Sequence, residues 1–247
     1  MENAVEVSSG GNGWDNVLGT VLKIPGVRVD RRAFLAREFA KYCDDDQVKA
    51  LLENGTARAG IPVDVLDKVA GGVIGFHGTL AVGISFVSGL PGGLAMLGTV
   101  PADLAQYFFH ALQVSQKLAY VYGYPDFDEV DDNFKMMMTI FIGVMLGVGA
   151  ASGALTTVSK MFAQTAVKRL SAAALTKGTI YPVVKAVART LGIRMTKQIF
   201  ARAVGKAIPL IGGVISGGLT AAIFLPSANK LKDKLRTNMA SLASVRR

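Results

Sequence analysis

Hydrophobic and polar positions along the chain follow a helical period. After a polar start, residues 14–24 form a short apolar stretch that ends at Pro25-Gly26. From Asp30 to Leu52, apolar residues recur three and four positions apart with basic residues between them. This spacing predicts one amphipathic helix, and Asp30 has the side chain of a helix N-cap.

Three long runs of the chain carry no charge. They are Val69–Ala102 with 34 residues, Met136–Ser159 with 24 and Ala207–Asn229 with 23. A helix needs about 20 apolar residues to cross a bilayer core, and each run exceeds that length. However, Gly89–Gly93 and Pro226 interrupt the first and third runs, so we do not expect simple spans there.

The basic segments on either side of the third run argue against a single crossing. Lys160–Lys206 holds ten Lys or Arg residues and no acid, and Lys230–Arg247 holds six with one acid. Short basic segments prefer the cytoplasmic face, and one crossing would separate the two. We therefore predict that the third run is a helical hairpin in a peripheral or monotopic protein. Met136–Ser159 is the best candidate for a single span.

The basic segment itself is expected to form two or three short helices, broken at Gly178, Pro182 and Gly192. One interpretation is an interfacial helix on anionic lipid, and the other is the solvated outer face of a bundle. The candidate membrane-surface residues are Lys185, Arg189, Arg194, Lys197, Arg202 and Lys206.

Small residues recur four positions apart in the uncharged runs. This spacing lets helix backbones approach closely, in membranes and in soluble bundles alike. The pairs are Gly71/Gly75, Gly143/Gly147, Gly149/Gly153 and Gly213/Gly217.

One predicted helix that opens at Pro101 carries a polar stripe between apolar runs. The stripe fits the lining of a ligand cavity or the holder of a polar head group. The alternative is structural, with an acidic cap at the helix start and a histidine hydrogen-bonded in the core. The chain has two histidines and no third ligand spaced with them, so we predict no metal site. The candidate ligand-binding residues are Asp103, Gln106, Tyr107, His110 and Lys117.

Composition and charge indicate which kind of partner the protein binds. Hydrophobic residues make up 51% of the 247 residues and charged residues only 18%. The part before Lys135 has a net charge of −7 and the remainder +16. Basic halves bind either nucleic acid or anionic membranes, and the apolar runs and the lack of nucleic-acid motifs favour the membrane. The single cysteine excludes an internal disulfide framework, and the start lacks the pattern of a signal peptide.

Sequence motifs for catalysis or cofactor binding are missing. Gly147, Gly149 and Gly153 miss the dinucleotide-binding spacing by one residue, and Gly205-Lys206 lacks the upstream glycine of a phosphate loop. The acidic residues after Cys43 disfavour a reactive thiolate. We therefore expect a protein without enzymatic activity or cofactor.

Three stretches resemble the EcsC protein family. They are GLPGGLAMLGTVPADLAQYFFHALQVSQKLAYVYGYPDF (Gly89–Phe127), IPGVRVDRRAFLAREF (Ile24–Phe39) and KAIPLIGGVISGGLTAAI (Lys206–Ile223). The resemblance implies a bacterial, membrane-linked helical protein and transfers no catalytic residues. It singles out a turn motif of Pro91, Gly92, Gly93 and Pro101, and an entry motif of Pro25, Asp30 and Arg31.

These observations predict an all-α protein, a single compact bundle of amphipathic and glycine-rich apolar helices with some hairpins. Residues 1–13 are expected to be a flexible tail, 14–238 one helical domain, and 239–247 a basic tail. We expect a protein without enzymatic activity on the cytoplasmic face of the membrane that contacts anionic lipid and binds or shields a lipid or other apolar ligand. The alternatives are an accessory subunit of an ABC transporter or secretion system, and a pore-forming effector.

Overall fold

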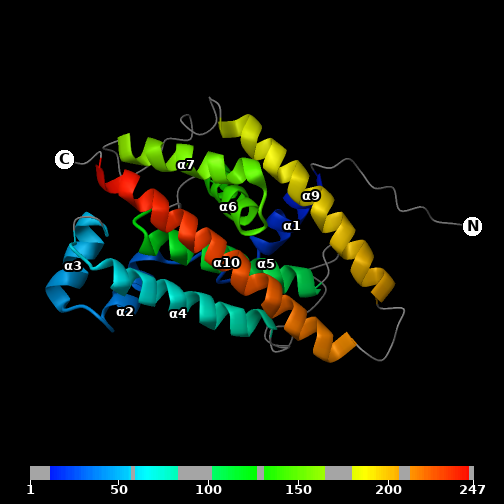
Figure 1. Ribbon diagram of the computed structural model, residues 1–247, viewed down its shortest axis with the longest axis horizontal. Helices are drawn as coiled ribbons and strands as arrows, with labels where there is room; N and C mark the ends of the chain where they lie inside the picture. The colour runs from blue at the N-terminus through cyan, green and yellow to red at the C-terminus, as the bar shows by residue number, and fades with distance from the viewer. Residues whose placement is uncertain are drawn as a thin grey trace, which may run out of the picture.

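The computed structural model describes residues 12–56, 59–82, 102–126, 131–164, 180–205 and 212–244. Over these ranges every regular element is a helix, and the helices pack into one bundle (Figure 1). The predicted all-α class is confirmed for this part of the chain. The helices are α1 Asn12–Val21, α2 Arg31–Phe39, α3 Asp45–Asn54, α4 Val63–Val82, α5 Ala102–Val121, α6 Asp131–Met145, α7 Gly149–Gln164, α9 Ile180–Gly205 and α10 Gly212–Ser244.

Helices α5 and α6 supply the centre of the bundle. Helix α5 contacts α1, α2, α4, α6 and α10, and α6 contacts α5, α7, α9 and α10. Every residue from Met136 to Met145 is buried. The most apolar part of the second uncharged run is therefore the protein's own core, where burial removes its side chains from water.

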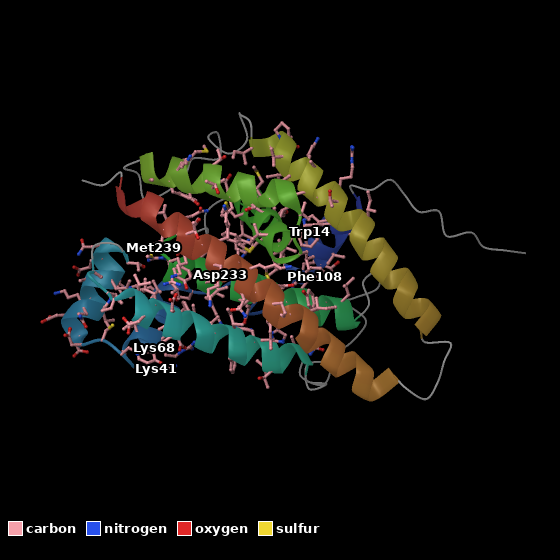
Figure 2. All side chains as sticks on the ribbon, viewed as in Figure 1. Trp14, Lys41, Lys68, Phe108, Asp233 and Met239 are labelled. Carbon is pink, nitrogen blue, oxygen red and sulfur yellow. The ribbon has the colours of Figure 1, made fainter. Side chains whose placement is uncertain are left out.

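Trp14 fixes α1 to this centre. Its side chain is fully buried, and its ring meets Phe108 of α5 edge to face at 5.4 Å. The indole Nε1–H donates to Thr139 Oγ1 of α6 at 2.9 Å, which satisfies the one polar group of the ring. Figure 2 shows Trp14 and Phe108 inside the bundle, with Lys41 and Lys68 at its edge.

Each of the two candidate membrane runs has the form that was expected for the other. Met136–Ser159, expected as a single helix, is interrupted by a turn between α6 and α7, where Gly147 has a φ of +69° that favours glycine. The predicted hairpin in the third run is wrong, because α10 continues from Gly212 through Pro226 to Ser244. No helix among the described ranges has both the length and the apolar composition to cross a membrane.

The predicted single helix from Asp30 to Leu52 is two helices. Asp30 caps α2, and its Oδ1 accepts from the Ala33 amide at 2.9 Å. A second cap interrupts the predicted helix at Asp44. The Asp44 carboxylate accepts from the Gln47 amide at 2.8 Å, and the Gln47 side-chain oxygen accepts from the Asp44 amide. The reciprocal pair is a capping box, and it starts α3 inside the acidic run that follows Cys43.

Glycines on the helices have two different environments. A Cβ at Gly143 would lie 2.6 Å from Val187 Cγ1 and 2.7 Å from Ala151 Cβ, so α6 approaches α7 and α9 closely there. By contrast, a Cβ at Gly71, Gly75, Gly149 or Gly153 would meet open space. The spacing of small residues thus marks close packing at Gly143 and an exposed helix face at the other described pairs.

Helix α9 is continuous from Ile180 to Gly205, so the predicted breaks at Pro182 and Gly192 are wrong. Pro182 lies in the first turn, where its missing N–H has no helical partner to lose. Gly192 is buried, and a Cβ at Gly13 of α1 would lie 3.7 Å from its Cα. Gly192 therefore allows α1 to lie against α9. The predicted break at Gly178 falls outside the described residues.

Candidate functional site

The side chains of the predicted polar stripe on α5 face two different neighbouring helices. Gln106 and His110 turn toward α4, where the Gln106 Nε2 donates to the Leu80 carbonyl at 3.1 Å. Tyr107 turns toward α10, with its ring 5.7 Å from that of Phe224. The side chain of Asp103 lies outside the described residues.

The side chains of His77, His110 and Lys117 form a chain of hydrogen bonds between α4 and α5. His77 Nδ1 lies 3.2 Å from His110 Nδ1, and Lys117 Nζ lies 2.7 Å from His77 Nε2. A lysine ammonium only donates, so His77 Nε2 accepts and the His77 proton is on Nδ1. That proton is donated to His110 Nδ1. Both imidazoles are neutral in this arrangement, and the positive charge is on Lys117. We call these three residues the basic cluster.

Burial lowers the pKa of each member of the basic cluster. The exposed fractions of His77 and His110 are 1% and 4%. Loss of hydration, and then the nearby Lys117 charge, lower the pKa of His77 to about 3 and that of His110 to about 4. Loss of hydration, and then the charge of Arg37, lower the pKa of Lys117 to about 8. At neutral pH, the histidines are therefore uncharged and the lysine is mostly charged.

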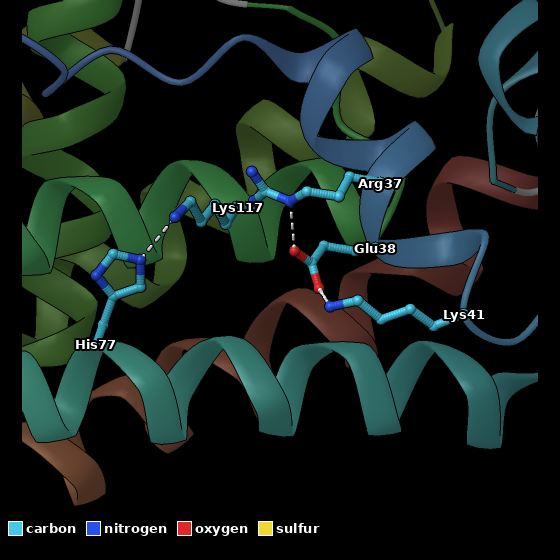
Figure 3. Close-up of polar contacts among 5 residues, drawn as sticks. All are labelled: Arg37, Glu38, Lys41, His77 and Lys117. Atoms are coloured by element: carbon cyan, nitrogen blue, oxygen red, sulfur yellow. Dashed lines mark hydrogen bonds and ion pairs between the residues drawn. The ribbon is translucent and has the colours of Figure 1, made fainter.

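The acid whose charge acts on Lys117 is already paired with two other basic side chains. Glu38 of α2 pairs with Arg37 at 3.0 Å and with Lys41, and these contacts hold its pKa below the usual value although burial opposes them. Figure 3 shows this group beside Lys117, whose ammonium points instead at His77. Among the side chains that the structure describes, Lys117 forms no ion pair with a carboxylate.

The entry motif has a structural role. Asp30 caps α2, and Arg31 Nε donates to the Tyr124 carbonyl at 3.3 Å. Burial lowers the pKa of Arg31, partly offset by Asp126 and Tyr120. Pro25 is exposed in the preceding loop. These contacts fasten the chain before α2 to the end of α5.

Gln116 of α5 completes the same attachment. Its Oε1 accepts from the Val29 amide at 3.0 Å, and its Nε2 donates to the Val27 carbonyl at 2.8 Å. The side chain is fully buried. Neither Gln116 nor His77 is among the residues that the sequence pattern singles out. The available signal was a polar residue inside an apolar helical pattern, because such a residue must find a partner when it is buried.

Four exposed apolar side chains lie on α4 and the first half of α10. We give the name apolar face to Phe76, Leu80 and Leu225, which are 60%, 40% and 37% exposed. Ile223 is 39% exposed, but it lies two positions from Leu225 and so points about 200° away from it around α10. The two helices lie side by side, and the Leu225 side chain packs over Gly78 of α4. From Val69 to Val82, α4 carries no charged residue, and neither does α10 before Lys230. This surface therefore exposes apolar groups without charges among them.

Helix α9 carries five basic residues and no acid. Lys185 and Arg189 are exposed, and the Lys185 Nζ lies 5.0 Å from the centre of the Tyr181 ring. The side chains of Arg194, Lys197 and Arg202 lie outside the described residues, as do Lys206 and all of the turn motif, Pro91, Gly92, Gly93 and Pro101. Figure 1 shows that α9 runs toward the end of the bundle at which α4 ends and α10 begins.

The described residues contain no group of three or more His, Cys, Asp or Glu side chains that could hold a metal ion. Comparison with known proteins adds no relative, because no protein-family model, curated protein or solved structure matches the chain. The resemblance to the EcsC family stays a prediction.

Proposed function

We propose that this protein is a peripheral membrane protein without enzymatic activity that binds anionic lipid surfaces and holds a lipid or other apolar ligand. The apolar face carries the proposal. Large exposed apolar side chains normally occur singly on a soluble surface, and grouped ones mark interaction sites. Here Phe76, Leu80 and Leu225 lie on two adjacent helices with no charged residue among them.

The apolar face alone gives weak binding. Full burial of a Leu or Phe side chain contributes roughly 1.5–3 kcal/mol, and each of these three side chains is already partly buried. Together they supply a few kcal/mol, which suits reversible attachment at the lipid interface rather than insertion across the bilayer.

The charge of α9 supplies the second contribution. Its five basic residues are unopposed by acids within the helix, and each basic residue near an anionic leaflet contributes about 1 kcal/mol. The cytoplasmic leaflet carries such anionic lipids, so it is the surface this charge fits. Apolar contact and charge attraction together form the two-part attachment expected of an interfacial protein.

Vesicle flotation tests the proposal. Wild-type protein is expected to float with vesicles that contain phosphatidylserine and to stay behind with neutral vesicles or in high salt. A Phe76→Ser/Leu80→Ser variant should lose at least about tenfold in apparent affinity, because it removes most of the α4 contribution. The matched control is Tyr42→Ser, since Tyr42 is 50% exposed and lies in the turn between α2 and α3, away from the apolar face.

Two outcomes would contradict the proposal. If the wild-type protein does not bind anionic vesicles at low salt, the proposed membrane binding is wrong. If the Tyr42 control and the α4 variant lose equal affinity for the vesicles, the apolar face has no specific role in binding. Release of an enclosed dye by the wild-type protein would point instead to a pore-forming effector, and co-purification with a transporter without lipid binding would point to an accessory subunit.

A further inference from the structure

The basic cluster holds a charge that has no balancing acid in the described structure. Lys117 is half-buried between α4 and α5, and its ammonium donates to His77 Nε2. That bond uses one of the three N–H groups of the ammonium. A charge removed from water is costly unless an opposite charge or strong hydrogen bonds replace the lost hydration.

The surrounding groups make this site attractive to an anion. Lys117 faces His77 from α4, Arg37 and Glu38 from α2, and His110 from its own helix. The histidines are neutral at pH 7, so they neither oppose the protonation of Lys117 nor balance its positive charge. Glu38 is held by Arg37 and Lys41, and the net charge around Lys117 is positive.

Apolar groups adjoin the same imidazole. The Phe76 ring packs edge to face against His77 at 5.3 Å, and Phe76 is 60% exposed. On the other side, the Lys117 ammonium lies 5.9 Å from the centre of the Phe34 ring. A ligand that places a negative group at Lys117 can therefore lay an apolar chain over Phe76 and Leu80 on the outer surface of α4.

We propose that Lys117 binds the carboxylate of a fatty acid, with the acyl chain lying over Phe76 and Leu80. The proposal rests on the proposed binding of an apolar ligand, and it names the chemical class of that ligand. A single ammonium is balanced by a monoanion, and the carboxylate has two oxygens that accept the remaining N–H groups. His77 positions the ammonium by accepting its third N–H.

Calorimetric titration with sodium decanoate below its micelle concentration tests this assignment, with the Lys117→Met variant and a Lys68→Met control. Lys68 lies on α4, but its side chain is 60% exposed and pairs with Asp64 at 3.5 Å. Decanoate should bind the wild type and the control alike. Lys117→Met should bind at least about tenfold more weakly, because a charge-assisted hydrogen bond is lost. The variant should still fold, since it removes a half-buried charge without leaving a carboxylate unpaired.

The pH profile gives a readout that a structural role of Lys117 would not move. Decanoate affinity should fall as the pH rises above about 8, the pKa of Lys117 in the free protein, because the neutral amine loses its charge attraction. The Lys117→Met variant should lack this fall. Thermal melting at each pH confirms that both proteins remain folded during the titrations.

Comparison ligands separate the parts of the assignment. Acetate should bind much more weakly than decanoate. If acetate and decanoate bind equally well, the acyl chain does not contribute to binding. Inorganic phosphate that competes with decanoate at equal concentration would overturn the carboxylate assignment. Equal decanoate binding by wild type and Lys117→Met would overturn the role of Lys117. If wild-type protein floats with anionic vesicles but does not bind decanoate, the proposed membrane function stands and this inference fails.

Discussion

The two buried histidines should make the stability of the protein depend on pH in a narrow window. His77 and His110 are the only histidines of the chain, and no other side chain has an ordinary pKa between 5 and 7. In the unfolded chain both titrate near 6.5, whereas in the folded protein their pKa values are about 3 and about 4. Between these values, the unfolded state binds protons that the folded state does not.

The sign and size of the effect follow from this difference. Acidification favours the state that binds more protons, so the free energy of unfolding must fall as the pH drops below 6.5. Each pH unit contributes about 1.4 kcal/mol per histidine. At pH 5, each histidine has therefore reduced stability by about 2 kcal/mol and the pair by about 4 kcal/mol. The loss continues toward pH 4, where the pKa of folded His110 is reached.

Urea unfolding at pH 7, 6 and 5, followed by circular dichroism, measures the slope. His77→Gln and His110→Gln each remove one titrating group and keep a polar side chain at the position, so each variant should show about half of the wild-type loss. The double variant should be nearly independent of pH between 7 and 5. A wild-type protein whose stability does not change over this window would refute the burial of neutral histidines. An unchanged slope in the double variant would show that other groups are responsible.

The packing of the helices gives two further predictions. Gly143→Ala should destabilise the protein by about 1–3 kcal/mol because its Cβ meets Val187 at 2.6 Å, whereas Gly75→Ala should stabilise it by up to about 1 kcal/mol because its Cβ meets open space. Urea unfolding compares the two, and a loss of stability in both would contradict the exposed position of Gly75. Thr139→Val should cost about 1–3 kcal/mol because it leaves the buried Trp14 indole N–H without its acceptor. Unfolding followed by the fluorescence of this single tryptophan measures that loss, and unchanged stability would argue against the bond.

Helical periodicity was enough to predict the class of the fold, but it did not place several helix ends. Asp30 was recognised as a cap because an acidic residue precedes an amphipathic pattern. The pattern does not mark Asp44 as a cap, because the apolar spacing continues across it toward Leu52 and a capping box depends on one local pair with Gln47. In α9, Gly192 predicts a break from the sequence alone, although a buried glycine in a helix also permits close packing. Such a choice depends on the neighbouring helix, which local sequence does not reveal.

The candidate site was predicted in part for a similar reason. The stripe of α5 includes His110 and Lys117, and His110 is buried and hydrogen-bonded to His77, as the structural alternative predicts for that residue. Their partner His77 was not singled out because it lies 33 positions from His110 and is surrounded by apolar and small residues. A lone histidine in an apolar run is a signal that it meets another polar group, but the identity of that group comes only from the packing of α4 against α5.

The uncharged runs have different roles in the structure, although all of them lack charged residues. From Met136 to Met145 the second run is completely buried, so its apolar residues are explained by the core alone. The first run has two faces on α4, because His77 is buried against α5 while Phe76, its neighbour in sequence, is 60% exposed. Successive helical residues point about 100° apart, so one short segment supplies both a core contact and a surface contact. A hydropathy sum over a window cannot separate these two uses, but the position of each residue around the helix can. The exposed half of α4 carries the lipid contact proposed above.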